Sequence, residues 1–300
     1  MSPSIPHAPT LPPALPGPLG KAQSLARGLP SPQGLLPPQG LPLHEAVSGP
    51  WRWIPPLAGS GPFQMALDEL LLDQAVAAST PQACLRLYSW SGPWLSLGYH
   101  QRHLPSAWLT LAQQRLVKLV RRPSGGRAVL HGGSLTYALI QPHAAGDRRQ
   151  AYRHHCRWLQ RAFAELGQPL SFGTERVVGE SGSCFARSSA ADLVHGNGAK
   201  RIGSAQLWRR GVLLQHGSLL IDPPRELWWQ LFGGPPPDLP ALPEGGQALM
   251  ARLRRAAEAD LCCGPLQDRQ LDHQERADLQ RRIASQPTVE LVPTHGPSRA

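Results

Sequence analysis

Two short turn sequences divide the segment between Ala191 and Ile221 into three apolar stretches. The first turn is His195-Gly-Asn-Gly198 and the second is Arg210-Gly211. Glycine and asparagine adopt positive φ angles at little cost, so both sequences favour tight hairpins between strands. The segment therefore predicts a three-stranded antiparallel meander, which limits the fold to classes that contain an antiparallel sheet.

Helical patterns and further short strands surround this meander. Gly61-Pro62 precedes apolar residues at helical spacing and predicts a helix over 62–78. Short strands mixed with helices and joined partly by hairpins are typical of an α+β fold rather than a doubly wound sheet. The remaining patterns predict strands over 84–88, 94–97, 116–120 and 135–140, and helices over 104–114, 148–166, 246–262 and 268–284.

Proline is concentrated at the start of the chain, where 13 of the 33 prolines fall within residues 1–50. This stretch cannot bury enough apolar surface to offset the entropy of ordering, so we expect residues 1–50 to be disordered. An organellar transit peptide or a mistaken start codon would be alternatives, although Lys21 and Arg27 are its only fixed positive charges. We assign residues 51–234 to a catalytic domain and residues 235–300, after a run of prolines, to a helical C-terminal appendage.

The sequence has neither a membrane span nor a secretion signal. No stretch offers the roughly 18 consecutive apolar residues that a spanning helix needs, and no charged start precedes an apolar segment. We therefore expect a soluble, cytoplasmic protein that does not bind a membrane. The cysteines are too irregularly spaced for a disulfide framework or a zinc site, so we expect free thiols and no metal at Cys84, Cys156, Cys184, Cys262 and Cys263.

Three segments contain more glycine, histidine and small polar residues than a core uses. Glycines in the segment Arg121–His131 would let a ligand approach the backbone, whose amides can hold an oxyanion or a phosphate. The other two segments are Gly198–Gln206 and Leu214–Ser218. Taken alone, each has a simpler explanation: a loop of solvated arginines, an exposed hairpin lysine, and a core histidine bonded to a backbone carbonyl.

Together, these segments resemble the lipoate-protein ligase A and biotin ligase superfamily, and more closely its octanoyltransferase branch. The resemblance extends from about Phe63 to Asp222. It implies a mixed, largely antiparallel sheet flanked by helices, with an acyl chain in an apolar tunnel beside the glycine-rich loop. The segments that show the resemblance are Met65–Glu69, Leu85–Trp90, Leu95–Gln101, Arg121–His131, Leu135–Tyr137, Ser183–Phe185, Lys200–Gln206 and Leu214–Ser218.

Cys184 lies in the loop Glu180-Ser-Gly-Ser-Cys-Phe185. The resemblance implies that this loop carries the acyl-accepting cysteine of the octanoyltransferase branch. The short lipoyl-octanoyl transferases place their thiol just before the His-Gly of the meander, where this chain has Gln215. A free cysteine is usually a small buried hydrophobe, but the neighbours of Cys184 are polar. We therefore interpret Cys184 as the nucleophile.

The resemblance also implies roles for the other segments. Lys200 would stabilise the Cys184 thiolate and accept the proton of the incoming amine. Since exchange between thioesters is nearly thermoneutral, neither ATP nor another cofactor is needed. Backbone amides near Gly203–Ala205 or in the glycine-rich loop would hold the oxyanion. The residues expected to bind substrate are Arg122, Ser124, Gly125, Gly126, Arg127, His131, Gly203, Ser204, Ala205 and His216.

The resemblance implies an acyl carrier protein as the octanoyl donor and a lipoyl domain or the glycine cleavage H protein as the acceptor. Such partners are acidic, which suits the formal charge of +10 on this chain. Nucleic-acid binding is the rival explanation of that charge, but neither a helix-turn-helix signature nor an aromatic and basic platform supports it. The arginines expected to steer the partners are Arg121, Arg122, Arg148, Arg149, Arg153 and Arg157.

Two other functions fit the same superfamily. An ATP-dependent lipoate-protein ligase forms an acyl-adenylate and needs no thiol at Cys184. A non-catalytic lipoyl-binding protein is also open, because the stretch 186–191 lacks the aromatic and acidic residues expected after the cysteine loop.

Overall fold

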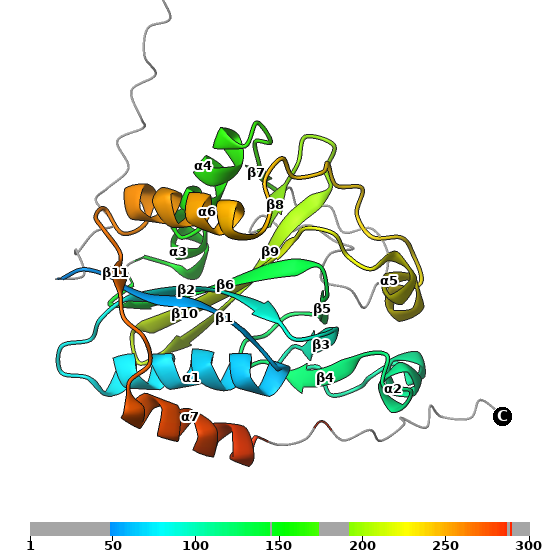
Figure 1. Cartoon of the computed structure of the whole chain (residues 1–300), viewed down its shortest axis with the longest axis horizontal. Helices are drawn as coiled ribbons and strands as arrows, with labels where there is room; N and C mark the ends of the chain where they lie inside the picture. Colours follow the sequence, from blue (N-terminus) through cyan, green and yellow to red (C-terminus); the bar gives the residue numbers. More distant parts are fainter. Residues whose placement is uncertain (1–48, 145, 174–191, 287–288, 290–300) are drawn as a thin grey trace, which may run out of the picture. The chain divides into compact units, whose positions relative to one another are not determined.

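A large mixed sheet forms the centre of the computed structural model, which describes residues 49–144, 146–173, 192–286 and 289 (Figure 1). Its order among these residues is β11-β1-β2-β6-β10-β9-β8-β7. β1 runs parallel to β2 and β11, and all other pairs are antiparallel, so the mixed and largely antiparallel sheet is confirmed. The strands are β1 (Arg52–Gly59), β2 (Cys84–Trp90), β6 (Ser134–Pro142), β7 (Ser171–Phe172), β8 (Leu193–Val194), β9 (Lys200–Arg209), β10 (Val212–Leu220) and β11 (Gln267–Asp268).

The predicted meander is confirmed as strands β8, β9 and β10. The hairpin between β9 and β10 turns at Arg210 and Gly211, whose φ angles are 48° and 80°. Gly198, with φ of 82°, lies in the turn between β8 and β9. Positive φ at Gly198 and Gly211 explains why glycine is favoured at these two positions.

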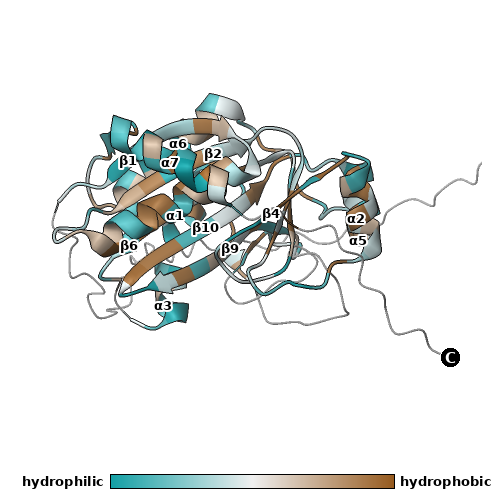
Figure 2. Cartoon of the chain, turned by 90° about the horizontal axis from the view of Figure 1, so that it is seen from below, coloured by the Kyte–Doolittle hydropathy of each residue, from teal (hydrophilic) through white to brown (hydrophobic). Residues whose placement is uncertain are grey.

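Helices cover both faces of the large sheet (Figure 1). One face packs against α3 (Arg148–His154), α4 (Arg157–Glu165) and α6 (Gly246–Asp260). The other packs against α1 (Gly61–Ala77), which itself contacts α7 (His273–Ser285). Figure 2 shows brown apolar segments along the strands, whereas α3 and α7 are largely teal, as expected for helices with one side in water.

A second, three-stranded sheet lies beside the large one (Figure 1). It consists of β4 (Lys118–Arg121), β3 (Trp94–Leu97) and β5 (Val129–His131), in that order. Its apolar side packs against α2 (Ser106–Gln113) and α5 (Arg225–Phe232) around the buried Trp108 and Trp228. β4 also contacts α1, so the small sheet lies next to the α1 face of the large sheet.

The structure differs from the sequence prediction in six places. The elements β1, β5, β7, β11 and α5 were not predicted, and the single helix expected over 148–166 is divided into α3 and α4. β1 contains Pro55-Pro56, and its pairing with β2 is interrupted there by a bulge, which accommodates prolines within a strand. Between α3 and α4, the His155 carbonyl accepts from the Trp158 indole at 2.9 Å instead of continuing the helix.

The C-terminal segment completes the same sheet and both helical layers. The predicted helices over 246–262 and 268–284 correspond to α6 and α7. β11 adds a strand beside β1, and α6 packs against α4. The boundary between residues 234 and 235 that the sequence suggested remains a prediction, as does the state of residues 1–50.

Candidate active site

A cavity lies between the α1 face of the large sheet, α1 itself and the small sheet. It encloses about 450 Å³ of space, including its open mouth, and most of its lining is apolar. A mostly apolar lining with a few polar groups is typical of sites that bind organic ligands. Of the residues that the sequence singled out, those that line the cavity are Arg122, Gly126, His131, Gly203, Ser204, Ala205 and His216.

The glycine-rich loop that follows the C-terminal end of β4 is tightly packed against the residue after β3. A side chain at Gly98 would place its Cβ 1.8 Å from the carbonyl oxygen of Gly126, and Gly126 has φ of 96°. Both positions therefore require glycine. The buried Arg122 guanidinium fixes the loop by donating to the carbonyls of Gly125 at 2.8 Å and Arg127 at 2.6 Å.

A buried chain of hydrogen bonds joins this loop to the large sheet. His216 on β10 donates from Nδ1 to Asp68 Oδ2 at 2.9 Å, and its Nε2 lies 2.6 Å from Ser124 Oγ. Asp68 also accepts from Arg86 Nη1 at 3.1 Å and from the Tyr88 hydroxyl at 3.0 Å. The chain orients the imidazole of His216 and ties Ser124 to the strand that forms the opposite wall.

Asp68 belongs to the segment Met65–Glu69 that carries the resemblance, but it was not predicted as a site residue. The structure corrects this: Asp68 is fully buried on α1. Its position three residues after Met65 and four before Leu72 places it on the buried stripe of the helix. That spacing was the signal available in the sequence.

His131 lies at another corner of the cavity, on β5. Its ring stacks on Trp90 with centroids 3.9 Å apart, and its Nε2 lies 2.8 Å from Ser96 Oγ. Burial, reinforced by Arg122 and His216, lowers the pKa of His131 well below the usual value. The imidazole is therefore neutral at physiological pH.

Lys200 begins β9 and is buried, as is Asp192, which the sequence prediction missed. Lys200 Nζ lies 2.9 Å from Asp192 Oδ1, and the two side chains are 3% and 7% exposed. Lys200 is not among the residues that line the cavity, nor are Gly125 and Arg127; Ser124 reaches it only through His216. Cys184 lies outside the described residues, so its role as nucleophile remains a prediction.

Three of the four cysteines that the structure describes have a raised pKa, which disfavours the reactive thiolate form. Cys84 and Cys156 are buried, and burial raises the pKa of each to about 12. Cys156 lies beside Tyr137 and Gln215 on the α4 side of the sheet. Burial also raises the pKa of Cys262, whereas Cys263 is exposed.

In the part of the chain that the structure describes, no cluster of three histidine, cysteine, aspartate or glutamate side chains is arranged to hold a metal ion. Among the same residues, no helix has the length and apolar character needed to span a membrane.

Comparison with known proteins identifies the family. The model of the lipoyl protein ligase A/B catalytic domain matches residues 60–238. The octanoyltransferase LipM of Kyrpidia tusciae is 37% identical over 183 residues, covering 57% of this chain and 66% of that protein. The LipM of Geobacillus kaustophilus is 37% identical over 197 residues (62% and 70%), and that of Symbiobacterium thermophilum is 36% identical over 215 residues (68% and 75%).

Solved structures agree on the fold. A protein of T. acidophilum with bound lipoic acid superposes with a TM-score of 0.67 at 17% identity, covering 79% of this chain and 95% of that one. A lipoate-protein ligase A bound with ATP gives a TM-score of 0.64 at 16% identity, with 79% and 95% coverage. The chain therefore belongs to the lipoyl protein ligase A/B catalytic domain family, in its octanoyltransferase branch, and is an acyltransferase.

Proposed function

We propose that this protein transfers an octanoyl group from an acyl carrier protein to a lysine of a lipoyl domain or of the glycine cleavage H protein. The observation that carries the proposal is the identity of 36–37%, over 183–215 residues, to proteins named octanoyltransferase LipM. The function belongs to protein lipoylation.

Cys184 takes part in both proposed half-reactions. Its thiolate attacks the carbonyl carbon of the carrier thioester, the carbon–sulfur bond to the carrier breaks, and the carrier leaves as a thiolate. The acceptor lysine then attacks the carbonyl carbon of the new thioester, an amide bond forms, and the bond between that carbon and the Cys184 sulfur breaks. The proton lost by the amine balances the negative charge of the thiolate that the carrier released. The sum is one thioester consumed and one amide formed, so ATP is not required.

The cavity suits the acyl chain of this reaction. Met65, Tyr88 and Val129 give it apolar walls, and Gly126 and Gly203 leave room along the backbone. An eight-carbon chain gains roughly 0.8 kcal/mol for each methylene that it buries. We propose that the chain lies in this cavity with its carbonyl toward the polar residues.

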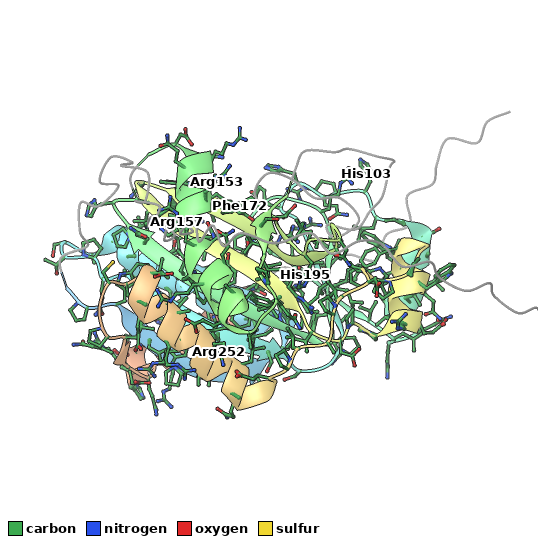
Figure 3. All side chains as sticks on the ribbon, turned by 90° about the horizontal axis from the view of Figure 1, so that it is seen from above. His103, Arg153, Arg157, Phe172, His195 and Arg252 are labelled. Carbon is green, nitrogen blue, oxygen red and sulfur yellow. The ribbon has the colours of Figure 1, made fainter. Side chains whose placement is uncertain are left out.

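The charges of α3 and α4 support acidic partners. Arg148, Arg149, Arg153 and Arg157 are exposed, and Figure 3 shows Arg153 and Arg157 on this layer, with Arg153 4.6 Å above the Phe172 ring. Exposed cations of this kind accelerate encounter with an acidic protein. Arg122, by contrast, is buried within the glycine-rich loop, and Arg121 donates to the carbonyls of Gly98 and Gln101.

The test is transfer without ATP. Purified protein is incubated with octanoyl carrier protein and apo H protein, and every component is weighed by mass spectrometry. The wild type should gain and then lose one octanoyl group, while H protein gains one. Cys184→Ser should lower the transfer rate by at least about a hundredfold, because a hydroxyl is a far poorer nucleophile than an activated thiol.

Cys263→Ser is the matched control, because Cys263 is exposed and its replacement disturbs no core packing. It should transfer at the wild-type rate. Transfer that proceeds only with ATP and is indifferent to Cys184 would identify an adenylating ligase. Binding of lipoyl domains without transfer under either condition would identify a non-catalytic protein.

A further inference from the structure

Two buried polar atoms at the cavity have no hydrogen-bond partner in the described part of the protein. They are Nδ1 of His131 and the hydroxyl oxygen of Ser218. Both residues line the cavity, and they are 4% and 3% exposed. Because a buried polar atom without a partner costs about 1–3 kcal/mol, such atoms need an explanation.

The hydrogen bonds of Ser96 fix the tautomer of His131. Arg122 can only donate, and its Nη1 lies 3.3 Å from Ser96 Oγ. The Ser96 hydroxyl hydrogen therefore has His131 Nε2, 2.8 Å away, as its acceptor. Since the ring is neutral, its hydrogen is on Nδ1, which makes the unpartnered atom a donor.

Ser218 lines the same cavity as His131 and is linked to it through Trp90 and Thr136. Trp90 stacks on His131 and donates from its indole nitrogen to Thr136 Oγ1 at 2.9 Å. Thr136 on β6 is the direct neighbour of Ser218 on β10. The indole and threonine groups are thus paired with each other, while the imidazole N–H and the Ser218 hydroxyl remain available to a ligand.

We infer that His131 Nδ1 and the Ser218 hydroxyl form a carbonyl-binding subsite that donates hydrogen bonds to the acyl oxygen of the substrate. A carbonyl oxygen accepts two hydrogen bonds and donates none, which matches two donors that line an apolar cavity. This inference rests on the proposed octanoyl transfer. Donors placed there would also stabilise negative charge on that oxygen during attack on the thioester.

Heptyl methyl ketone labelled with ¹³C at its carbonyl is a suitable probe, because it has the octanoyl chain and no leaving group. In the wild type, the infrared carbonyl stretch of bound ketone should lie below its value in heptane. His131→Gln can place its amide oxygen near the position of Nε2, where it accepts from Ser96, and it loses the donor at Nδ1. It should shift the stretch toward the heptane value and weaken binding about two- to tenfold.

His131→Asn is the matched variant, because its amide nitrogen lies near the position of Nδ1 and should retain the low stretch. Ser218→Ala should give a partial shift toward the heptane value. It removes a hydroxyl without a partner at little folding cost, so it also tests the subsite if His131→Gln does not fold. Ser134→Ala removes another unpartnered buried hydroxyl, outside the cavity lining, and should change nothing.

A heptane-like stretch in the wild type, or a low stretch that survives in His131→Gln and Ser218→Ala, would overturn the inference. The ketone cannot acylate the protein, so Cys184→Ser should keep the low stretch. Failure of octanoyl transfer together with a normal infrared result would refute the proposed function and leave the subsite standing. Normal octanoyl transfer together with a heptane-like carbonyl stretch in the wild type would refute the subsite and leave the proposed function standing.

Discussion

The ion pair of Lys200 and Asp192 is buried, so a change at either residue affects folding as well as chemistry. Lys200→Met leaves the Asp192 carboxylate in the interior without its ammonium and should lower the free energy of unfolding by about 3–5 kcal/mol. Lys200→Met combined with Asp192→Asn removes both charges and should recover at least half of that loss. Urea unfolding measures the recovery.

Transfer rates separate the two roles of Lys200. If Lys200 supports the chemistry, both half-reactions should be slow in the single and the double variant, although the double variant is the more stable. Wild-type rates in the double variant would show that Lys200 has a purely structural role.

His195 makes stability depend on pH below neutrality. Burial, with a smaller effect of Arg201, lowers its pKa to about 4, and Arg201 Nε donates to its Nε2 at 2.8 Å. The unfolded chain, with a pKa near 6.5, therefore binds the proton first, and stability falls as pH drops from about 6.5 to about 4. His195→Gln should remove roughly 2 kcal/mol of this loss in urea titrations across that range.

The exposed His103 provides the control for this experiment, and Figure 3 labels both residues. His103→Gln should keep the wild-type pH profile. An unchanged profile in His195→Gln would contradict the assignment and direct attention to His131, whose pKa is lowered in the same sense.

At the scale of elements, α7 is joined to the sheet by its first turn. Glu275 closes a capping box with Asp272, and its carboxylate also pairs with the buried Arg52 of β1, with Nη2 and Oε2 2.8 Å apart. Glu275→Ala leaves Arg52 uncompensated and should cost about 3–5 kcal/mol. Asp272→Ala loses only the cap and should cost about 1 kcal/mol.

An exposed ion pair on the same helix provides the comparison for these stability costs. Asp278 pairs with Arg281, whose side chain is 66% exposed. Asp278→Ala should change the free energy of unfolding by less than about 0.5 kcal/mol. Equal costs for Glu275→Ala and Asp278→Ala would mean that the Arg52 pair does not hold α7 in place.

The elements that the sequence predicted share strong local signals. The hairpin at Arg210-Gly211 and the helix after Gly61-Pro62 follow from turn and capping chemistry, which act within a few residues. β1 was missed because Pro55-Pro56 disfavours a strand locally, whereas its partners β2 and β11 are distant in the sequence. The break at His155 depends on the side chain of Trp158, which spacing alone does not reveal.

The candidate site divides in the same way. Motifs identified His131, His216 and the glycine-rich loop, and the structure brings them to one cavity. Asp192 was missed, and Ser218 was named only as the end of the segment Leu214–Ser218, because the importance of both depends on which residues lie near them in space. Pairing across β6, β9 and β10 supplies those neighbours, and a single sequence carries little information about such register.

At the scale of the whole molecule, the sequence predicted that residues 235–300 form an appendage, and truncation tests this directly. α6 places Leu249 and Leu253 in the core beside α4, and α7 places Leu279 against α1. Removing residues 235–300 should expose this surface, so the shortened chain should bind ANS, lose its near-ultraviolet dichroism and unfold without a cooperative transition. Removing only residues 290–300 takes away none of these contacts and should leave the urea midpoint unchanged. Cooperative unfolding of residues 1–234 with native dichroism would instead establish a separable appendage.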